Sequence, residues 1–432
     1  MLDIELFRNN LEKIIASEEK RFKDLNNAKK VLEYDIKWRN ALQQLEEARR
    51  KRNEISRQIG EYKKAGKEKE ANKAIEQSNK IKEEIEELEQ DAEEFLQKRQ
   101  EYRYIVGNIV HDSVPIGETE EENQIIRVVG ETPDFKFKPV SHVDLIELIN
   151  GADVLKASEV VGSRFYYLKG DLALLNLALM KFAIEFLQNK GYLPMWTPFF
   201  VKYDIIRAAA ELADFEEQLY KIQDEDLYMI ATSEQTLAAY HYDEIIDPDN
   251  LPLKYAGISS CFRREAGSHG KDTLGIFRVH QFEKIEQYVF CKPEDSWEFH
   301  EELIQNAEEL YKKLEIPYRI VSIASGELND NAAKKYDLEA WFPASNTYRE
   351  LVSCSNCLDY QARKLKIRMG KVGATEEKET VHTLNSTAIA TERTICTLIE
   401  NFQNKDHSII IPKVLRKYMN GKKVITPLKK KS

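Results

Sequence analysis

Apolar residues recur at alternating spacings of three and four between about Asn27 and Tyr104, in a stretch rich in Lys, Glu, Gln and Ala that has no proline. This spacing is typical of α-helices that pack against each other along one apolar face. A short polar stretch, residues 60–66, lies between the two halves of the pattern and has a glycine at each end. Glycine there interrupts a helix and lets the chain reverse. The pattern predicts an antiparallel two-helix coiled-coil arm, with helices of about 36 residues and a reach on the order of 50 Å.

The pattern changes after the predicted arm. Residues 106–141 combine an acidic run with Pro115, Gly117, Pro133 and Pro139, which is the composition of a linker. From residue 142 onward, helix-like segments such as 172–190 and 297–314 alternate with strand-like segments such as 275–289 and 318–322. Consecutive strands with few helices between them predict an α+β domain built on an antiparallel sheet. The expected division is an N-terminal domain 1–105 with the arm, a linker 106–141 and a domain 142–432.

Charge is unevenly distributed along the chain. With 432 residues and a net charge of -10, the protein is large enough for a sizeable core but does not have a uniformly basic surface. Between residues 29 and 70, however, Lys and Arg outnumber Asp and Glu, and residues 49–52 are all basic. Charges on a long helix pair often serve solubility alone. Any contact with nucleic acid is therefore expected to be local, with the distal half of the arm as the candidate region.

Cysteine content and the N-terminus bear on location. The five cysteines are an odd number in a large chain, which argues against a disulfide scaffold and for a reducing compartment. Residues 1–10 include Asp3 and Glu5 and lack the apolar core of a signal peptide. No run approaches the roughly 18 apolar residues that cross a bilayer. A cytoplasmic protein without membrane association is expected.

Residues 255–289 carry the clearest chemical signal. Two strand-like runs flank a polar loop, residues 266–275, that contains three glycines. Alternation places Arg263 and Glu265 on one strand and Arg278, His280 and Phe282 on its partner. Arginine binds phosphate oxygens through paired hydrogen bonds, and an aromatic ring stacks on a base. The segment predicts a nucleotide site, although any one of these residues taken alone would more often be a surface ion pair or part of the core.

Three segments resemble known motifs. Phe262-Arg263-Arg264-Glu265 resembles motif 2 of the class II aminoacyl-tRNA synthetases, and residues 267–273 together with 279–282 resemble the seryl-tRNA synthetase family in its eukaryotic and archaeal style. Residues 190–198 are similar to motif 1, which builds the dimer interface in this class, and residues 384–394 resemble motif 3. The N-terminal hairpin is also a feature of this family, so the resemblance covers essentially the whole chain.

The resemblance implies an ATP site with Arg263 and Arg393 as catalytic residues. Arg263 would hold the α-phosphate, Glu265 would contact the adenine side and Phe282 would stack on the adenine. Arg278 and Arg393 would engage the phosphate tail, and Glu350 with Ser353 would hold Mg²⁺. The implied ATP-binding residues are Arg263, Arg264, Glu265, Arg278, Val279, His280, Gln281, Phe282, Glu350, Leu351, Val352, Ser353 and Arg393.

The resemblance also implies a serine pocket. Thr232-Ser233-Glu234 is similar to the Thr-x-Glu of the family. Carboxylates at Glu234 and Glu286 would pair with the ammonium and hydroxyl groups of serine. Either Asn385 or Thr387 would meet the hydroxyl. The implied serine-binding residues are Thr232, Ser233, Glu234, Arg263, Glu286, Asn385 and Thr387.

The implied activity is that of a homodimeric ligase. It would activate L-serine with ATP to seryl-adenylate, release pyrophosphate, and transfer serine to the 3′ end of tRNA(Ser). tRNA(Sec) is a further candidate substrate, and the arm would grip the long variable arm of the tRNA. One alternative is a paralogue that keeps the fold as a binding or regulatory module, and another is an enzyme that charges a carrier protein. Retention of Arg263, Glu286, Glu350 and Arg393 argues against the first alternative, and the basic arm argues against the second.

Cys354 and Cys357 form a Cys-x-x-Cys pair, which can mark zinc or redox chemistry. A second such pair is missing from the sequence. The two cysteines are therefore interpreted as small residues beside the ATP site.

Overall fold

The computed structural model describes residues 1–209, 218–265, 274–371, 373 and 378–428, in two compact units, Met1–Ile109 and Val110–Ser432. Most of the loop between the strand-like runs of the nucleotide signal, including residues 267–273 of the family resemblance, lies outside the described residues. Within the described ranges, none of the helices combines the length and apolar character needed to cross a membrane.

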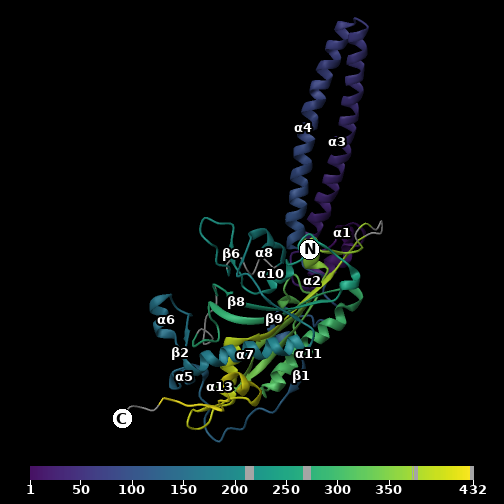
Figure 1. Cartoon of the computed structure of the whole chain (residues 1–432). Coiled ribbons are helices and arrows are strands. Elements are labelled where there is room, and N and C mark those ends of the chain that lie inside the picture. Colours follow the sequence, from purple (N-terminus) through teal and green to yellow (C-terminus); the bar gives the residue numbers. More distant parts are fainter. Residues whose placement is uncertain (210–217, 266–273, 372, 374–377, 429–432) are drawn as a thin grey trace. The chain divides into compact units, whose positions relative to one another are not determined.

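The N-terminal unit contains the predicted arm. Helices α1 (Ile4–Asn9) and α2 (Leu11–Lys20) precede α3 (Asn26–Lys64) and α4 (Glu68–Ile105), which run antiparallel as the long hairpin in Figure 1. The chain reverses later than predicted, at Gly66, which has φ +70°. Helix α3 continues through Gly60, because a glycine in an exposed helix costs only about 1 kcal/mol relative to alanine. The coiled-coil arm is confirmed, with a shorter turn.

The interior of the arm is built mainly from small side chains. Leu45 and Ala48 of α3 pack with Ile85 of α4, and further buried alanines lie along both helices. Several charged side chains are buried in this unit, among them Asp35. The carboxylate of Asp35 is completely inaccessible and accepts hydrogen bonds from Arg8 Nε at 2.8 Å and Arg99 Nη1 at 2.7 Å. This bridge ties α1 to both long helices.

The second unit is organised around an eight-stranded sheet with the strand order β1-β10-β11-β12-β15-β9-β8-β4. Every pairing is antiparallel except that of β4 with β8, so the predicted antiparallel sheet is confirmed. The strands are β1 (Gln124–Val129), β4 (Leu193–Trp196), β8 (Leu253–Phe262), β9 (Gln281–Cys291), β10 (Tyr318–Ser322), β11 (Lys334–Phe342), β12 (Thr347–Leu358) and β15 (His382–Ala390).

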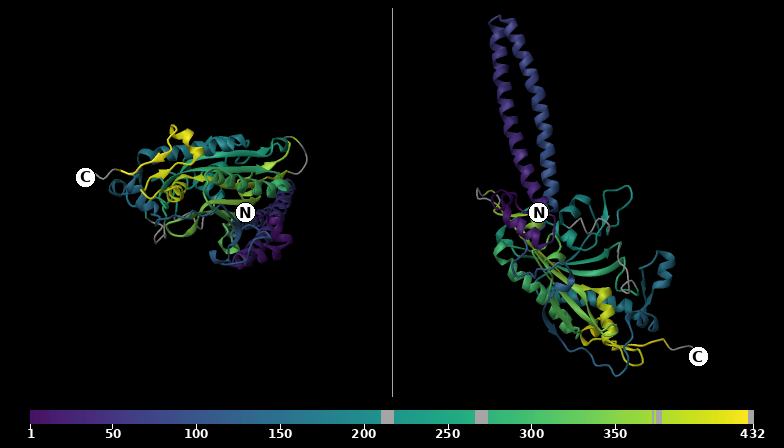
Figure 2. Two further views of the ribbon diagram at one scale, coloured as in Figure 1. Left: turned by 90° about the horizontal axis from the view of Figure 1, so that it is seen from below. Right: turned by 180° about the vertical axis from the view of Figure 1, so that it is seen from behind.

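Three long helices cover one face of this sheet. Helices α7 (Gly170–Asn189), α11 (Ser296–Lys313) and α13 (Thr391–Asn401) lie along the strands in the views of Figures 1 and 2. Their apolar sides are buried against the strands in the main hydrophobic core of the described residues. On β9 the odd-numbered residues Ile285, Val289 and Cys291 enter that core. The even-numbered residues Lys284 and Glu286 line a pocket on the opposite side, whereas Tyr288 and Phe290 further along the strand belong to a second hydrophobic cluster.

Shorter elements are also formed by the described residues of this unit. The helices among them are α5 (His142–Leu148), α6 (Val154–Val160), α8 (Tyr203–Ala209), α10 (Glu234–Ala238) and α12 (Tyr360–Lys364). The 3₁₀ turns are Glu120–Glu122, Pro248–Asn250, Pro293–Asp295, Ser325–Glu327 and Lys413–Met419. The remaining strands are β2 (Ala152–Asp153), β3 (Tyr167–Leu168), β5 (Phe200–Val201), β6 (Tyr228–Met229), β7 (Ile245–Ile246), β13 (Arg368–Met369), β14 (Glu379–Thr380), β16 (Ile409–Ile410) and β17 (Val424–Ile425).

The segment expected to be a linker contributes to the sheet. Within residues 106–141, β1 pairs with β10 and forms the edge of the eight-stranded sheet. Proline and acidic residues around a six-residue strand gave that stretch the composition of a linker. The division into domains 1–105 and 142–432 with a linker between them stays a prediction.

Candidate active site

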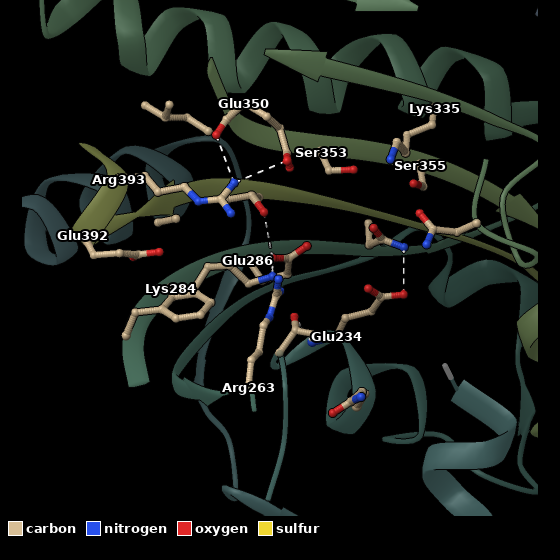
Figure 3. Close-up of a pocket in the computed structure, with 18 of the residues that line it drawn as sticks. Glu234, Arg263, Lys284, Glu286, Lys335, Glu350, Ser353, Ser355, Glu392 and Arg393 are labelled. Carbon is tan, nitrogen blue, oxygen red and sulfur yellow. Dashed lines mark hydrogen bonds and ion pairs between the residues drawn. The ribbon is translucent and has the colours of Figure 1, made fainter. Parts of the chain in front are cut away.

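A pocket opens on the face of the sheet opposite the long helices. On β9, Phe282, Lys284 and Glu286 line it at every second position, because successive side chains of a strand point to opposite faces. Glu286 lies opposite Thr387 of β15, and Asn385 of the same strand lies opposite Ser355 of β12. The pocket is therefore lined by one row of side chains that crosses three strands (Figure 3).

Two β-bulges adjust which residues reach the pocket. Glu350 and Ser353 are three apart, so on a regular strand they would face opposite sides. In β12 the register shifts at Leu351, which allows both side chains to line the pocket. A second shift at Ala388 of β15 does the same for Thr387 and Ala390. Bulges re-aim side chains in this way beside many active sites.

A glycine lets a helix approach the sheet on another side of the pocket. Gly257 of β8 lies opposite Glu286, and a Cβ atom there would be 2.6 Å from Ser233 Oγ and 2.7 Å from Leu237 Cδ1. Any larger residue would push α10 away. The close approach brings Glu234, the first residue of α10, into the pocket together with Glu286.

Charges of both signs line the pocket. Arg393 Nη1 donates to the backbone oxygen of Glu350 at 3.0 Å and lies 3.3 Å from its carboxylate, and Lys284 Nζ lies 2.6 Å from Glu286 Oε2. The Arg263 guanidinium lies 5.2 Å from the centre of the Phe282 ring. The cationic lining residues are Arg263, Lys284, Lys335 and Arg393, and the acidic ones are Glu234, Glu286, Glu350 and Glu392. Such a site suits a ligand with both phosphate and ammonium groups.

Burial and neighbouring charges together shift the pKa values of the pocket acids in different directions. Burial, followed by the neighbouring charge of Glu286, raises the pKa of Glu234 to about 7. Burial also raises the pKa of Glu392 to about 8. Burial opposes ionisation of Glu350 too, but Arg393 and the other nearby cations outweigh it and lower the pKa of that carboxyl. The Glu350 carboxyl is thus held as an anion at neutral pH.

Comparison with known proteins decides the family. Residues 1–110 match the seryl-tRNA synthetase N-terminal domain, and residues 218–402 match the class II tRNA synthetase core domain for G, H, P, S and T. A serine–tRNA ligase of Methanosphaera stadtmanae is 56% identical over 425 residues, which cover 98% of this chain and 99% of that protein. The chain belongs to the seryl-tRNA synthetase family.

Solved structures of this family agree with the fold over the whole chain. The crystal structure of seryl-tRNA synthetase from Pyrococcus horikoshii complexed with ATP has a TM-score of 0.93 and 44% identity, and covers 99% of this chain and 100% of that one. The cytoplasmic serine–tRNA ligase from Naegleria fowleri in complex with AMP has a TM-score of 0.88 and 42% identity, with 99% of each chain covered. The chain is accordingly an ATP-dependent ligase that joins serine to tRNA.

Many of the site residues expected from the seryl-tRNA synthetase resemblance line the pocket. They come from five separate segments of the chain and approach one another only in the folded unit. The expected residues that line it are Thr232, Glu234, Arg263, Phe282, Glu286, Glu350, Leu351, Ser353, Asn385, Thr387 and Arg393.

Other expected residues lie outside the pocket lining. Val279 and Val352 are buried in the core behind the sheet, and Ser233 packs toward Gly257. Glu265 forms an ion pair with Arg278, with Oε2 and Nε 2.5 Å apart. The expected residues outside the lining are Ser233, Arg264, Glu265, Arg278, Val279, His280, Gln281 and Val352.

Several lining residues were not identified from the seryl-tRNA synthetase motifs. The sequence could have predicted Lys284 as a lining residue, because it stands between Phe282 and Glu286 at the two-residue period of a strand face. The sequence could not have predicted Lys335, since only the pairing of β11 with β12 places it opposite Ser355. The residues added by the structure are Gln235, Lys284, Asn329, Asn331, Lys335, Ser355, Ala390 and Glu392.

The oxygen atoms near β12 fit a magnesium ion that is shared with a nucleotide. Glu350 offers a carboxylate and Ser353 a hydroxyl on the same side of the pocket. Mg²⁺ is usually held by one or two carboxylates together with substrate phosphates and water. Among the described residues, no group of three or more His, Cys, Asp or Glu side chains is placed to hold a metal without such help. Cys354 and Cys357 are both buried.

Proposed function

We propose that this pocket activates serine with ATP and that its residues act in the roles that the family resemblance implies. One observation carries the proposal: Arg263, Glu286, Glu350 and Arg393, which lie far apart in the sequence, line one pocket that carries both signs of charge. The reaction joins a serine carboxylate oxygen to the α-phosphorus of ATP and breaks the bond to the β-phosphate, which releases pyrophosphate.

The half of the pocket around Arg263 and Arg393 binds ATP. Phe282 stacks on the adenine, Arg263 holds the α-phosphate and Arg393 engages the phosphate tail. Negative charge grows on the α-phosphate oxygens in the transition state, and guanidinium groups already fixed in place stabilise it without reorganising. The backbone bond from Arg393 to Glu350 and the contact of Arg263 with Phe282 support this fixed geometry.

The half of the pocket around Glu234 and Glu286 binds serine. The hydroxyl of Thr387 lies 3.4 Å from Glu286 Oε2, whereas the amide of Asn385 donates to Glu234 at 3.0 Å. We therefore assign Glu286 and Thr387 to the serine hydroxyl, and Glu234, supported by Asn385, to the ammonium group. A site that hydrogen-bonds a substrate hydroxyl discriminates strongly against an analogue without it, by up to about 10⁵-fold, so alanine is rejected.

Glu350 and Ser353 hold Mg²⁺ together with the phosphates of ATP. The ion supplies charge neutralisation on the phosphate oxygens when it is bound. Glu350 serves this role because the surrounding cations keep its carboxylate ionised. Its contact with Arg393 also keeps the acid and the arginine in one place before ATP arrives.

In the second step serine is transferred to the 3′ end of tRNA(Ser), and AMP is released. The arm formed by α3 and α4 recognises the tRNA through its distal basic half, where residues 49–52 are all Arg or Lys. Such contacts attract the phosphate backbone and weaken with added salt. tRNA(Sec) is the second candidate substrate, because the same arm would meet any tRNA with a long variable arm.

The active form is a homodimer in the cytoplasm. Leu193 and Trp196 of the edge strand β4, in the segment that resembles the class II dimer motif, are 58% and 72% exposed, and Leu155 of α6 is 78% exposed. Large exposed apolar residues beside an unpaired strand edge usually mark an interface. The five free cysteines are consistent with a reducing compartment.

The deciding experiment is ATP–pyrophosphate exchange with each of the twenty amino acids, with and without tRNA. Exchange with serine alone is expected. Exchange with no amino acid would reject the assignment of activation to this pocket and favour a chain that uses the fold only for binding.

A further inference from the structure

The carboxylate of Glu234 receives its hydrogen bonds on one oxygen only. Gln361 Nε2 donates to Oε1 at 2.8 Å, and Asn385 Nδ2 donates to the same oxygen at 3.0 Å. Across the described part of the chain, no side chain donates to the other oxygen, Oε2. Glu234 lines the pocket, where Figure 3 shows its carboxylate bonded on one side. Oε2 is therefore the oxygen left for a ligand.

Gln361 lies behind the pocket, in α12, and is completely buried. Its Nε2 also donates to the Ala209 carbonyl at 2.8 Å, and its Oε1 accepts from Tyr288 OH at 2.9 Å and Thr383 Oγ1 at 2.8 Å. A side-chain amide offers two donor hydrogens and two acceptor lone pairs, so every position is used. The Ala209 carbonyl and the Glu234 carboxylate can only accept hydrogen bonds, so only one orientation of the Gln361 amide fits this site.

The hydrogen bond from Gln361 to Glu234 matters because the surroundings of Glu234 disfavour the ionised form of its carboxyl group. Burial raises its pKa to about 7, with a further contribution from Glu286, while the hydrogen bond from Gln361 acts in the opposite direction. A donor to the charged form favours ionisation. The charged and titratable groups that face Glu234 are Glu286, Lys284, Arg263, Cys357 and Tyr288.

We infer that Gln361 is a positioning residue for amino-acid binding: by holding Oε1 it leaves Oε2 of an ionised Glu234 for the ammonium group of serine. The inference rests on the proposed role of Glu234 in the serine site. Gln361 touches neither substrate and acts through Glu234 alone.

Gln361→Glu tests this role, because it keeps the size of the side chain and an acceptor for Tyr288 and Thr383 but removes the donor to Glu234. In ATP–pyrophosphate exchange, the KM for L-serine is expected to rise by about 10-fold or more, the usual effect of losing a hydrogen bond to a charged group. The KM for ATP should stay within about two-fold. The acid limb of kcat/KM for serine should move to higher pH by about one unit, because Glu234 becomes harder to ionise.

Tyr288→Phe is the matched control. It removes a buried hydroxyl from the same network without touching Glu234, so the KM for serine should change far less than in Gln361→Glu. Thermal unfolding of each variant reports whether the fold is kept. If Gln361→Glu does not fold, Gln361→Asn decides the matter, because it withdraws the amide by one methylene and adds no charge.

Two results would reject the inference. The first is a folded Gln361→Glu protein in which the KM for serine and the acid limb are both unchanged. The second is an equal rise in the KM for serine and the KM for ATP, which would indicate a structural role only. Glu234→Gln distinguishes a failure of this inference from a failure of the proposed serine site. A normal KM for serine in Glu234→Gln would refute the serine site itself, whereas a defective Glu234→Gln beside a normal Gln361→Glu would refute only the role of Gln361.

Discussion

The arm and the pocket are built on opposite principles. In the arm, neighbouring turns of two helices repeat the same contacts, and half of the buried residues of α3 and α4 are alanines that a short sequence window reveals. In the pocket, the functional side chains come from several separate strands and helices, and their places depend on strand register and on bulges. The arm can therefore tolerate many local changes, whereas the pocket depends on a few positions that only the folded unit brings together.

The largest effect is expected from Arg263→Ala. Loss of a fixed cation at the α-phosphate should lower serine-dependent ATP–pyrophosphate exchange by roughly a thousand-fold. Arg264→Ala changes the next residue of the same motif. Because Arg264 does not line the pocket, this substitution should lower the exchange rate much less. Near-normal exchange by Arg263→Ala would remove that residue from catalysis.

Replacement of residues 27–104 by a short Gly-Ser linker tests the independence of the two regions. Serine-dependent exchange should change by about two-fold at most, because the described pocket contains no residue of the arm. Aminoacylation of tRNA(Ser) should fall by roughly a hundred-fold or more, since the basic contacts to phosphate are lost. If charging is unaffected, the arm has no part in recognition.

Asp35→Ala probes a buried ion pair of the N-terminal unit. It leaves Arg8 and Arg99 without their partner, and removing one member of a buried ion pair costs about 3–5 kcal/mol. Hydrogen exchange should show faster opening at the base of α3 and α4, while the KM values for ATP and serine stay as in the wild type. Changed KM values would show that the two units are more tightly coupled than their separate cores suggest.

Glu392→Gln is expected to have the smallest effect, and the effect depends on pH. In the folded protein Glu392 keeps its proton up to about pH 8, whereas in the unfolded chain it ionises near its ordinary pKa of 4.5. Above that ordinary value the unfolded state binds fewer protons, so this group makes the wild type progressively less stable as pH rises towards 8. The variant should melt about 2 °C or more above the wild type at pH 9 and at a similar temperature at pH 4. An equal difference at both pH values would show that Glu392 is not held protonated.

Lys417, a basic residue near the C-terminus, forms an ion pair with a helix of the sheet-containing unit. Lys417 Nζ lies 3.0 Å from Glu185 Oε2, and Tyr418 OH donates to the same oxygen at 2.6 Å. These bonds join the 3₁₀ turn Lys413–Met419 to α7 and lower the pKa of Glu185 to about 2. Because the two partners are more than 200 positions apart in the chain, no local pattern could have predicted the contact.

The sequence alone determined the arm, the antiparallel sheet and the family, because heptad spacing, strand alternation and short motifs are local patterns. It also predicted Arg263, Glu286, Glu350 and Arg393 as site residues, since each stands in a recognisable segment, and all four line one pocket. Only the tertiary structure decided that β1 completes the sheet, that Lys335 reaches the pocket and that Gln361 holds Glu234. These features arise from strand register, bulges and burial, which depend on contacts between residues distant in the chain and leave no mark on the sequence around any one of them.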